Sequence, residues 1–518
     1  MEGATSERRS SAGVSGVAGF WVGIASGVVM TLALVALRFA MGSSTFSEAL
    51  ADWATRVTPP ATFDFVLTHL QVNAKPLLFA GVLVAQVIAG GGLGILYVRY
   101  EARLPFQAWQ PWRRGILIAA ALWLVVVLAV TPVTGGGLLG LSLPSGRLAY
   151  LTSTFLAMLA YGATLSHLHY ILASARDGER DAGRRRFLRI AAFTVALVGT
   201  GAFALRSIFR GASSVSPTQV TSNAGQLPSE ITPNDQFYEV SKNIVNPRVD
   251  VANWKLEIAG EVDNPYTLTY DELVALPWEE RYVTLTCISN PVGGNLISNA
   301  LWRGVPLKLL MERAQLLPTA QRLSFWAADG YVDSLRVERA LRDNVMVAYR
   351  MNGDPLPNDH GFPARLIAPG LYGMENVKWL TRIATAQDDF RGYWQRRGWA
   401  DTAVINTMSR VDVPSDSAAI PIGETMVGGV AFAGDRSVSK VEFSTDGGGT
   451  WQPATLRPAL SPYTWVLWTG AWTPAAGRHT LAVRATDGTG QPQVFQVQDS
   501  LPDGATGYHY LMVKVTET

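Results

Sequence analysis

The chain is poor in cysteine and in charge. Its single thiol, Cys287, excludes intrachain disulfides and every zinc or iron–sulfur site that needs several cysteines. Charged residues make up only 16% of the 518 residues, whereas 48% are apolar. This balance excludes a disordered chain as well as one small soluble domain, and the length suits two or three domains.

Positive charge is concentrated in the first part of the chain. Residues 1–210 hold 18 Lys and Arg against 9 Asp and Glu, and residues 211–518 hold 25 against 32. The acidic part contains no tract rich in Lys and Arg, and phosphate binding needs a clustered positive surface, so we expect no nucleic-acid partner. The positive excess of the front part indicates membrane topology instead.

Five apolar stretches in residues 1–210 are long enough to cross a bilayer, which needs about 20 helical residues. They cover residues 13–37, 76–98, 115–132, 148–172 and 187–209. The third has no charge between Gly115 and Val130, whereas a soluble helix would have a polar face. The apolar run of the fifth ends before Arg206, so it can also be interpreted as a signal-like segment. We predict a membrane region of five transmembrane helices in contact with the lipid bilayer.

Arginines in the short loops predict the orientation of these helices. The loops at 99–114 and 176–189 are rich in Arg, whereas those at 42–75 and 133–147 hold only three Lys or Arg residues. Because positive loops face the cytoplasm, the N-terminus and the Arg-rich loops are expected there. Five spans then place everything after Phe209 on the outer, periplasmic or extracellular, side of a bacterial cell membrane.

Two motifs inside the spans have structural interpretations that we favour. His167 and His169 stand two residues apart, so they do not share a helix face, and interfacial polar residues fit them better than haem ligands. The glycine run Gly90–Gly94 lies inside an apolar span, where close helix packing is more common than a nucleotide-binding loop. The sequence therefore assigns these helices no cofactor.

Composition divides the part of the chain after the spans. Residues 211–230 are rich in Ser, Thr, Gly and Pro and predict a linker. Residues 231–400 alternate short strands with helices, including a helix that begins at Thr269, and predict a mixed α/β domain. Residues 401–518 show short alternating strands with Asp-Gly turns, which predict an immunoglobulin-like β-sandwich without the disulfide.

Three linked motifs carry a family resemblance. They are Tyr282-Val283-Thr284-Leu285-Thr286-Cys287-Ile288-Ser289-Asn290 with Gly293-Gly294-Asn295, Ala300-Leu301-Trp302-Arg303-Gly304-Val305-Pro306-Leu307, and His360 to Gly373 followed by Lys378-Trp379. In this order they resemble the molybdenum-binding and pterin-binding segments of the sulfite oxidase family of molybdopterin-dependent oxidoreductases. The resemblance extends over about 231–515. It includes the family's C-terminal dimerisation domain, which implies a homodimer.

The resemblance implies a molybdenum–molybdopterin cofactor, with Cys287 as the metal ligand and catalytic residue. A molybdenum centre held by a dithiolene and oxo groups needs one soft protein ligand, and a thiolate supplies it. The common alternative for a lone cysteine is the role of a small buried apolar residue. The flanking motifs argue against that alternative here.

Further cofactor contacts follow from the same resemblance. His360, Arg365 and the backbone of Asn376, Val377 and Lys378 would bind the pterin and its phosphate, as charge-assisted hydrogen bonds allow. Phe237-Tyr238-Glu239 resembles the pterin-contacting segment of the family's periplasmic methionine-sulfoxide reductase branch. Asp235 stands where that branch has Asn, so Tyr238 is the stronger candidate of these two.

The reaction that the family implies is two-electron oxygen-atom transfer on a small-molecule substrate, with an electron-transfer partner that the sequence does not identify. In the family an arginine that binds the sulfite oxyanion follows the cysteine, whereas Ile288 to Asn295 contains none. Reduction of an S-oxide or N-oxide, including methionine sulfoxide, is therefore the alternative to a sulfite-type oxidation. The alternative of another class is a non-catalytic membrane-anchored binding protein, against which the presence of Cys287, Arg365 and Lys378 argues.

The segment Arg184-Arg185-Arg186-Phe187-Leu188-Arg189, followed by an apolar run, resembles the twin-arginine export signal of bacteria, although it is internal. The simpler interpretation is that these arginines only keep the loop on the cytoplasmic side. A cofactor inserted in the cytoplasm, however, would require export of a folded domain, which is what a twin-arginine signal directs. We therefore predict that changing Arg184 and Arg185 to Lys leaves the domain inside. Protease added to spheroplasts should then spare the variant and digest the parent, and equal digestion of both would contradict the signal.

Overall fold

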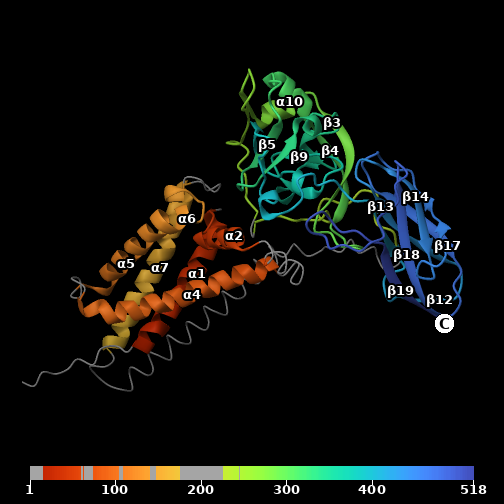
Figure 1. Ribbon diagram of the computed structural model, residues 1–518. Helices are drawn as coiled ribbons and strands as arrows, with labels where there is room; N and C mark the ends of the chain where they lie inside the picture. Colours follow the sequence, from red (N-terminus) through yellow and green to blue (C-terminus); the bar gives the residue numbers. More distant parts are fainter. Residues whose placement is uncertain are drawn as a thin grey trace, which may run out of the picture. The chain divides into compact units, whose positions relative to one another are not determined.

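The computed structural model describes residues 16–41, 43–59, 62, 74–103, 109–140, 147–174, 226–243 and 246–517. The chain divides into two compact units between Ser213 and Ser214 (Figure 1). The predicted fifth span at 187–209, the Arg184–Arg189 motif and most of the predicted linker lie outside the described residues.

Helices make up the described part of the first unit. They are α1 (Gly16–Met41), α2 (Phe46–Val57), α4 (Ala74–Tyr100), α5 (Pro111–Val125), a π-helical turn η3 (Val126–Val130), α6 (Thr131–Val133) and α7 (Arg147–Ser174), with short 3₁₀ turns η2 (Glu101–Arg103) and η4 (Leu138–Gly140). Four segments are long and apolar enough to cross a membrane, namely Gly16–Arg38, Leu77–Tyr100, Pro111–Val133 and Arg147–Ala173. These four correspond to the first four predicted spans.

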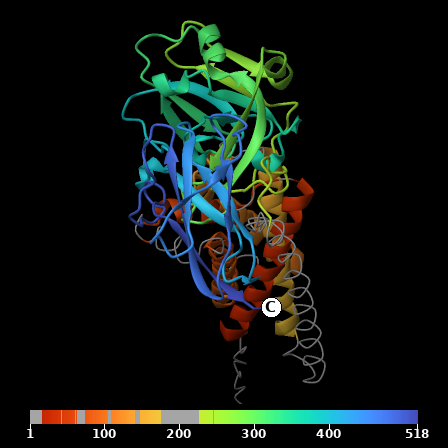
Figure 2. The same cartoon turned by 90° about the vertical axis from the view of Figure 1, so that its right-hand side faces the viewer.

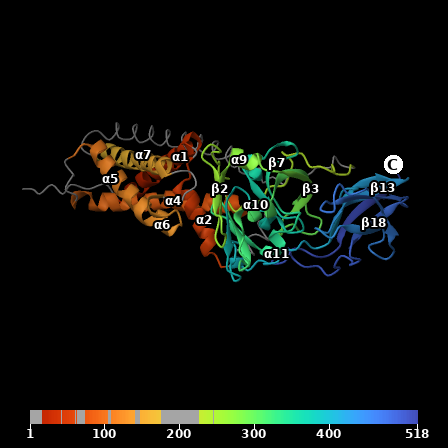
Figure 3. The same cartoon turned by 90° about the horizontal axis from the view of Figure 1, so that it is seen from above.

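Glycines let α1 and α4 approach closely. Figure 3 shows α1, α4, α5 and α7 together in one bundle, in which α1 packs against both α4 and α7 while α5 packs on α7. A Cβ on Gly23 of α1 would lie 2.3 Å from the carbonyl oxygen of Gly90, and one on Gly94 would lie 2.2 Å from that of Gly19. No side chain fits at such separations, so the glycine run of α4 serves helix packing, as its place in an apolar span predicts.

Two mixed or antiparallel sheets form the first part of the second unit. One has the order β2-β1-β10-β5-β6 and the other β3-β4-β7-β8, with β9 paired to β7; only β1 and β10 pair in parallel. The strands are β1 (Lys255–Ala259), β2 (Tyr266–Thr269), β3 (Glu279–Thr286), β4 (Ile297–Pro306), β5 (Arg322–Ala327), β6 (Val332–Arg336), β7 (Met346–Met351), β8 (Asp354–Pro355), β9 (Arg365–Ile367) and β10 (Leu380–Ala386).

Short helices connect these strands. They are α9 (Tyr270–Val274), α10 (Leu307–Ala314), α11 (Val337–Ala340) and the 3₁₀ turns η5 (Asn358–His360), η6 (Gly373–Glu375) and η7 (Gln395–Arg397). The helix predicted at Thr269 is present: the Thr269 hydroxyl accepts from Glu272 N, and the Glu272 carboxylate accepts from Thr269 N at 2.8 Å, which is a capping box. The predicted mixed α/β region is confirmed in this part of the chain.

Two further sheets form the C-terminal part. The first has the order β11-β13-β17-β16 and the second β12-β19-β18-β14-β15 (blue in Figure 2). Their strands are β11 (Met408–Val413), β12 (Ala419–Pro421), β13 (Thr425–Phe432), β14 (Val438–Ser444), β15 (Gln452–Pro453), β16 (Thr455–Leu456), β17 (Val466–Trp472), β18 (Gly477–Asp487) and β19 (His509–Thr516). Apolar side chains of both sheets, including Trp468, Phe443 and Val513, share one core, because alternate residues of each strand point inward.

Candidate functional site

Cys287 lies at the start of a tight loop that follows the buried end of β3. Its N–H donates to Leu296 O at 2.9 Å, which closes the loop, and Asn290 Oδ1 accepts from Leu296 N at 2.9 Å. The thiol is buried, and its Sγ lies 2.9 Å from Ser289 Oγ. No group of three or more His, Cys, Asp or Glu residues that could hold a metal occurs in the described part of the chain. A metal at Cys287 would therefore need most of its ligands from a cofactor.

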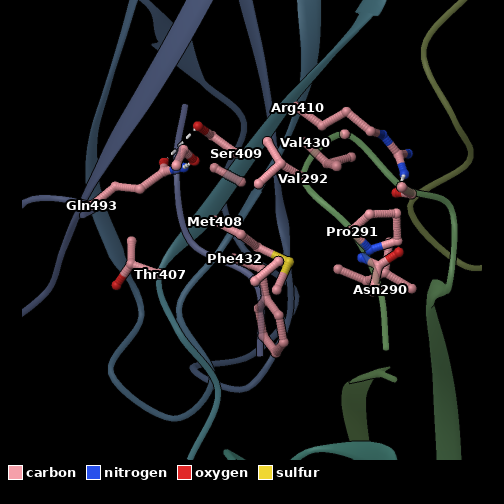
Figure 4. A pocket seen from close by; sticks show the side chains of 16 residues that line it. Asn290, Pro291, Val292, Thr407, Met408, Ser409, Arg410, Val430, Phe432 and Gln493 are labelled. Carbon is pink, nitrogen blue, oxygen red and sulfur yellow. Dashed lines mark hydrogen bonds between the residues drawn. The ribbon is translucent and has the colours of Figure 1, made fainter. Parts of the chain in front are cut away.

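The loop after Cys287 is held from the other side by the C-terminal sheets. Arg410 of β11 donates from Nη1 to Gly294 O at 2.6 Å, and Figure 4 shows its side chain reaching over this loop. Gly293 has a φ of +74° and packs so closely on the His509 ring that a Cβ would lie 2.3 Å from it. A cavity of about 30 Å³ remains between the loop and β11 and β13, with room for one or two water molecules.

Tyr238 brings the N-terminal segment of the second unit next to Cys287. Its backbone N–H donates to Ser298 Oγ of β4 at 3.1 Å, and its hydroxyl lies 2.6 Å from the position that a Cβ on Gly373 would take. Burial raises the pKa of the Tyr238 hydroxyl, the neighbouring Cys287 raises it further, and Arg365 lowers it. These interactions place the hydroxyl, the thiol and the guanidinium in one region.

Arg365, the first residue of β9, is a buried cation with neutral partners. Its Nη1 donates to His360 O at 2.9 Å and its Nη2 to Asn376 O at 3.1 Å, and its guanidinium lies 5.0 Å from the centre of the Trp302 ring. Its Nε has no hydrogen-bond partner, and no carboxylate of the described residues contributes to its pKa shift. Burial lowers its pKa to about 10, so the group stays charged at neutral pH. A buried charge without a counter-charge is costly, which indicates a site for an anion.

His360 and Lys378 stand beside Arg365 with depressed pKa values. Burial lowers the pKa of His360 to about 3, and the charges of Lys378 and Arg365 contribute. The imidazole is therefore neutral, and its Nε2 lies 3.1 Å from Asn234 O, which leaves Nδ1 as an acceptor when Nε2 carries the proton. Burial removes water from around Lys378, which is half-buried, and lowers its pKa to about 8. Its Nζ donates a hydrogen bond to Asp359 O at 2.9 Å.

Asn376 fixes the backbone that follows η6. Its Oδ1 accepts from Ala368 N at 2.8 Å, and its Nδ2 donates to Leu371 O and Tyr372 O. Its own N–H donates to Gly373 O, so this backbone donor is already engaged, and Val377 O accepts from Leu366 N. The segment predicted to contact the cofactor is thus rigid before any ligand binds.

Six of the eight predicted site residues lie close together, either in contact or separated by one residue. They are Tyr238, Cys287, His360, Arg365, Asn376 and Lys378. Val377 is buried between Asn376 and Lys378. Asp235 is exposed, and no hydrogen bond or ion pair joins it to the others within the described residues. Its neighbour Asn234 does take part, through the carbonyl that faces His360, and nothing in the sequence pattern singled Asn234 out.

Two further arginines of the second unit, Arg303 and Arg397, have partners of their own. Arg303 of β4 pairs with Glu280 at 2.7 Å and lies 4.0 Å from the centre of the Trp278 ring. Arg397 stacks on the Tyr393 ring at 3.7 Å and donates to Tyr393 O, while Arg396 is exposed.

Two buried carboxyl groups that sequence reasoning missed lie behind η6. Gln395 Nε2 donates to Asp333 Oδ1 at 2.7 Å and to Glu375 Oε1 at 2.9 Å, and Tyr331 Oη donates to Asp333 Oδ2 at 2.8 Å. Burial raises the pKa of Asp333 to about 7, and burial together with Asp333 raises that of Glu375. The pair carries less than two charges at neutral pH, because like carboxylates in a dry site do not both ionise.

This pair predicts a pH-dependent stability. Both folded-state pKa values exceed their unfolded values, so the stabilisation is present below about pH 4 and is lost as the pH rises through about 7. The buried Arg322 lowers the pKa of Glu375 and reduces the loss, whereas its partner Asp401 raises that pKa and opposes this effect. Glu375→Gln should raise the melting temperature of the second unit by about 3 to 6 °C at pH 8 and by less at pH 5, because the loss begins at the unfolded pKa and grows as the pH rises.

Scanning fluorimetry of the full chain at the two pH values measures this shift. The matched control is Asp343→Asn, because that carboxylate side chain is 88% exposed and its removal should not alter the pH dependence. An equal shift for Glu375→Gln at both pH values would show that packing, not titration, is responsible.

Comparisons with known proteins agree with this site. Residues 243–394 match the family model of the oxidoreductase molybdopterin binding domain. Similar curated proteins include the sulfite oxidase of Gallus gallus, 32% identical over 46% of this chain and 62% of that protein, and the mitochondrial sulfite oxidase of Homo sapiens, 32% identical over 46% and 52%. The NAD(P)H nitrate reductase of Hordeum vulgare is 30% identical over 50% of this chain and 36% of that protein.

The chain spans about half the length of the curated relatives it matches. Among solved structures, the sulfane dehydrogenase SoxCD from Paracoccus pantotrophus is similar with a TM-score of 0.49 and 24% identity, over 55% of this chain and 81% of that one. The second unit thus contains a segment that matches the oxidoreductase molybdopterin binding domain and is similar in sequence to sulfite oxidases.

Proposed function

We propose that the chain is a membrane-anchored, extracytoplasmic oxidoreductase that transfers an oxygen atom at a molybdenum centre ligated by Cys287. The observation that carries the proposal is the buried Arg365, which has only neutral partners and lies in one region with the Cys287 thiol and the Tyr238 hydroxyl. A phosphorylated pterin that brings its own sulfur ligands supplies both an anion for Arg365 and a metal for one thiolate. When bound, molybdenum supplies the two-electron chemistry.

The residues around the thiol fit this cofactor. The positive charges of Arg365 and Lys378 match the pterin phosphate, since charge-assisted hydrogen bonds are about twice as strong as neutral ones. Neutral His360 offers a hydrogen-bond acceptor without adding positive charge. The loop bonds at Asn290 and Arg410 keep Cys287 in place, so ligation requires no rearrangement of the backbone.

The cofactor assignment predicts how one variant loses molybdenum. The parent should contain close to one molybdenum per chain. Arg365→Met should bind the cofactor roughly 10- to 100-fold more weakly, since a hydrogen bond to a charged group contributes about 1.5 to 3 kcal/mol. Arg303→Met is the matched control, because that surface guanidinium is paired and stacked away from the thiol. Elemental mass spectrometry of purified protein measures the ratio.

Cys287→Ala should abolish turnover, and X-ray absorption at the molybdenum edge should show one sulfur neighbour fewer than in the parent. A parent ratio near zero, from a host that makes the cofactor, would favour the non-catalytic binding protein. Unchanged sulfur coordination in the Cys287 variant would remove the thiolate from the proposal and leave the pterin site intact.

The substrate follows from the charge near the thiol. Relatives of this chain include sulfite oxidases, and a sulfite-type oxidation is the second candidate. The loop from Ile288 to Asn295 has no arginine, and Arg410, which contacts this loop, is paired with Asp412 at 2.7 Å and bonded to Gly294 O. A neutral S-oxide or N-oxide fits such surroundings better than a sulfite anion does.

We therefore expect turnover of methionine sulfoxide or dimethyl sulfoxide with reduced viologen dye. For sulfite with ferricyanide, kcat/KM should be at least about 10- to 100-fold lower, which is the factor for one missing charge-assisted contact. The Cys287→Ala protein gives the background rate for both assays. Efficient sulfite oxidation without S-oxide reduction would reverse the preference while leaving the enzyme class unchanged.

The membrane location remains part of this proposal. It is supported by the four long apolar helices and by the distribution of arginines among their loops. Cytoplasmic insertion of the cofactor would give the Arg184–Arg189 motif a function. The immunoglobulin-like classification of the C-terminal sheets, the homodimer and the identity of the electron-transfer partner stay predictions.

A further inference from the structure

A tight turn directly after β3 brings a hydroxyl group to the thiol. The Asn290 N–H donates to Cys287 O at 3.0 Å, so residues 287–290 form a β-turn with Ser289 at its third position. Ser289 Oγ lies 2.9 Å from Cys287 Sγ. Because the backbone closes this turn, the contact between oxygen and sulfur does not depend on a long, flexible side chain.

The rest of the loop holds this turn in place. The Cys287 N–H donates to Leu296 O at 2.9 Å, and Asn290 Oδ1 accepts from Leu296 N at 2.9 Å. On the far side of the loop, Arg410 Nη1 donates to Gly294 O at 2.6 Å. The loop is therefore fixed at both ends, and the hydroxyl group is oriented toward the sulfur before any ligand binds.

Metal binding decides which of the two groups donates the proton. In the thiol form of Cys287, either Sγ or Ser289 Oγ can be the donor. A cysteine that ligates a metal is a thiolate and carries no proton. The Ser289 hydroxyl is then the donor and the sulfur is the acceptor. Such a hydrogen bond is charge-assisted and about twice as strong as one between neutral groups.

A hydrogen bond to a ligating sulfur affects the metal as well as the sulfur. It withdraws electron density from the thiolate, and hydrogen bonds to ligand sulfurs are one of the factors that set the reduction potential of thiolate-bound metal centres. A metal that gains an electron leaves more negative charge on its sulfur ligand. The hydrogen bond is therefore stronger in the reduced state, so it raises the reduction potential.

We propose that Ser289 is a positioning residue for the molybdenum centre, whose hydroxyl donates to the Cys287 thiolate and raises the reduction potential of the centre. The inference rests on the proposed function, because it requires Cys287 as the metal ligand. The loop from Ile288 to Asn295 contains no arginine. A neutral donor in this loop tunes the sulfur without adding a positive charge that would attract an anionic substrate.

The first test measures the hydrogen bond itself, by infrared spectroscopy of the full chain purified without metal from a host that does not make the cofactor. Cys287 is the only cysteine of the chain, so the S–H stretching band reports one residue. Ser289→Ala should shift this band, and Ser289→Thr, which keeps the hydroxyl, should restore its parent position. An unchanged band in the Ser289→Ala protein would overturn the inference.

The second test measures the reduction potential of the molybdenum-loaded full chain, by a redox titration followed through the electron paramagnetic resonance signal of the metal. At a fixed potential, Ser289→Ala should lower the ratio of reduced to oxidised metal about 3- to 10-fold. This factor corresponds to a midpoint about 30 to 60 mV lower for a one-electron couple. Ser289→Thr should return the midpoint to the parent value.

Thr286→Val is the matched control. It removes the hydrogen bond from Thr286 Oγ1 to Leu296 O at 3.1 Å, which belongs to the same loop but does not involve the sulfur. Leu296 O keeps its bond from Cys287 N, so the midpoint should not move. Equal shifts for Thr286→Val and Ser289→Ala would show that a loosened loop is responsible, and would overturn the role of the hydroxyl.

The two tests separate this inference from the proposed function. A loaded parent whose potential is unchanged by Ser289→Ala would overturn the inference alone. A parent without molybdenum, from a host that makes the cofactor, would contradict the proposed function and remove the tuning role with it. The infrared band would still show in that case whether the Ser289 hydroxyl binds the Cys287 sulfur.

Discussion

The site depends on one buried guanidinium. Arg365 links the carbonyl of His360 to that of Asn376, so two segments of the domain meet at a positive charge that no described carboxylate neutralises. Neutral partners orient the guanidinium without cancelling its field, and a dry environment strengthens that field. Protein lacking an anion there carries a cost that an anionic ligand would remove. The depressed pKa values of His360 and Lys378 follow from the same burial and the same charge.

The thiol is positioned by two parts of the second unit at once. β3 and the bonds of Asn290 set the start of the loop, while Arg410 and His509 hold its far side against the C-terminal sheets. The close contact at Gly293 explains why a residue without a side chain is needed there, at a positive φ. The C-terminal sheets are thus part of what shapes the site, whatever else they bind.

The turn η6 separates two environments of opposite character. On one side, Gly373 leaves space for the Tyr238 hydroxyl near Cys287 and Arg365. On the other side, Glu375 and Asp333 share the amide of Gln395 and tend to hold a proton. The backbone at Asn376, held by the hydrogen bonds of the Asn376 side chain, connects the two.

The sequence by itself determined the apolar helices, the mixed α/β region and the family motifs around Cys287 and Arg365. These features are local: about 20 apolar residues suffice for a span, and the motif residues stand in fixed order along the chain. The carbonyl of Asn234 and the Asp333–Gln395–Glu375 contacts could not be predicted. Only the tertiary structure decided them, because each joins side chains far apart in the sequence, and burial, which sets their charge and hydrogen bonding, exists only once the elements have packed.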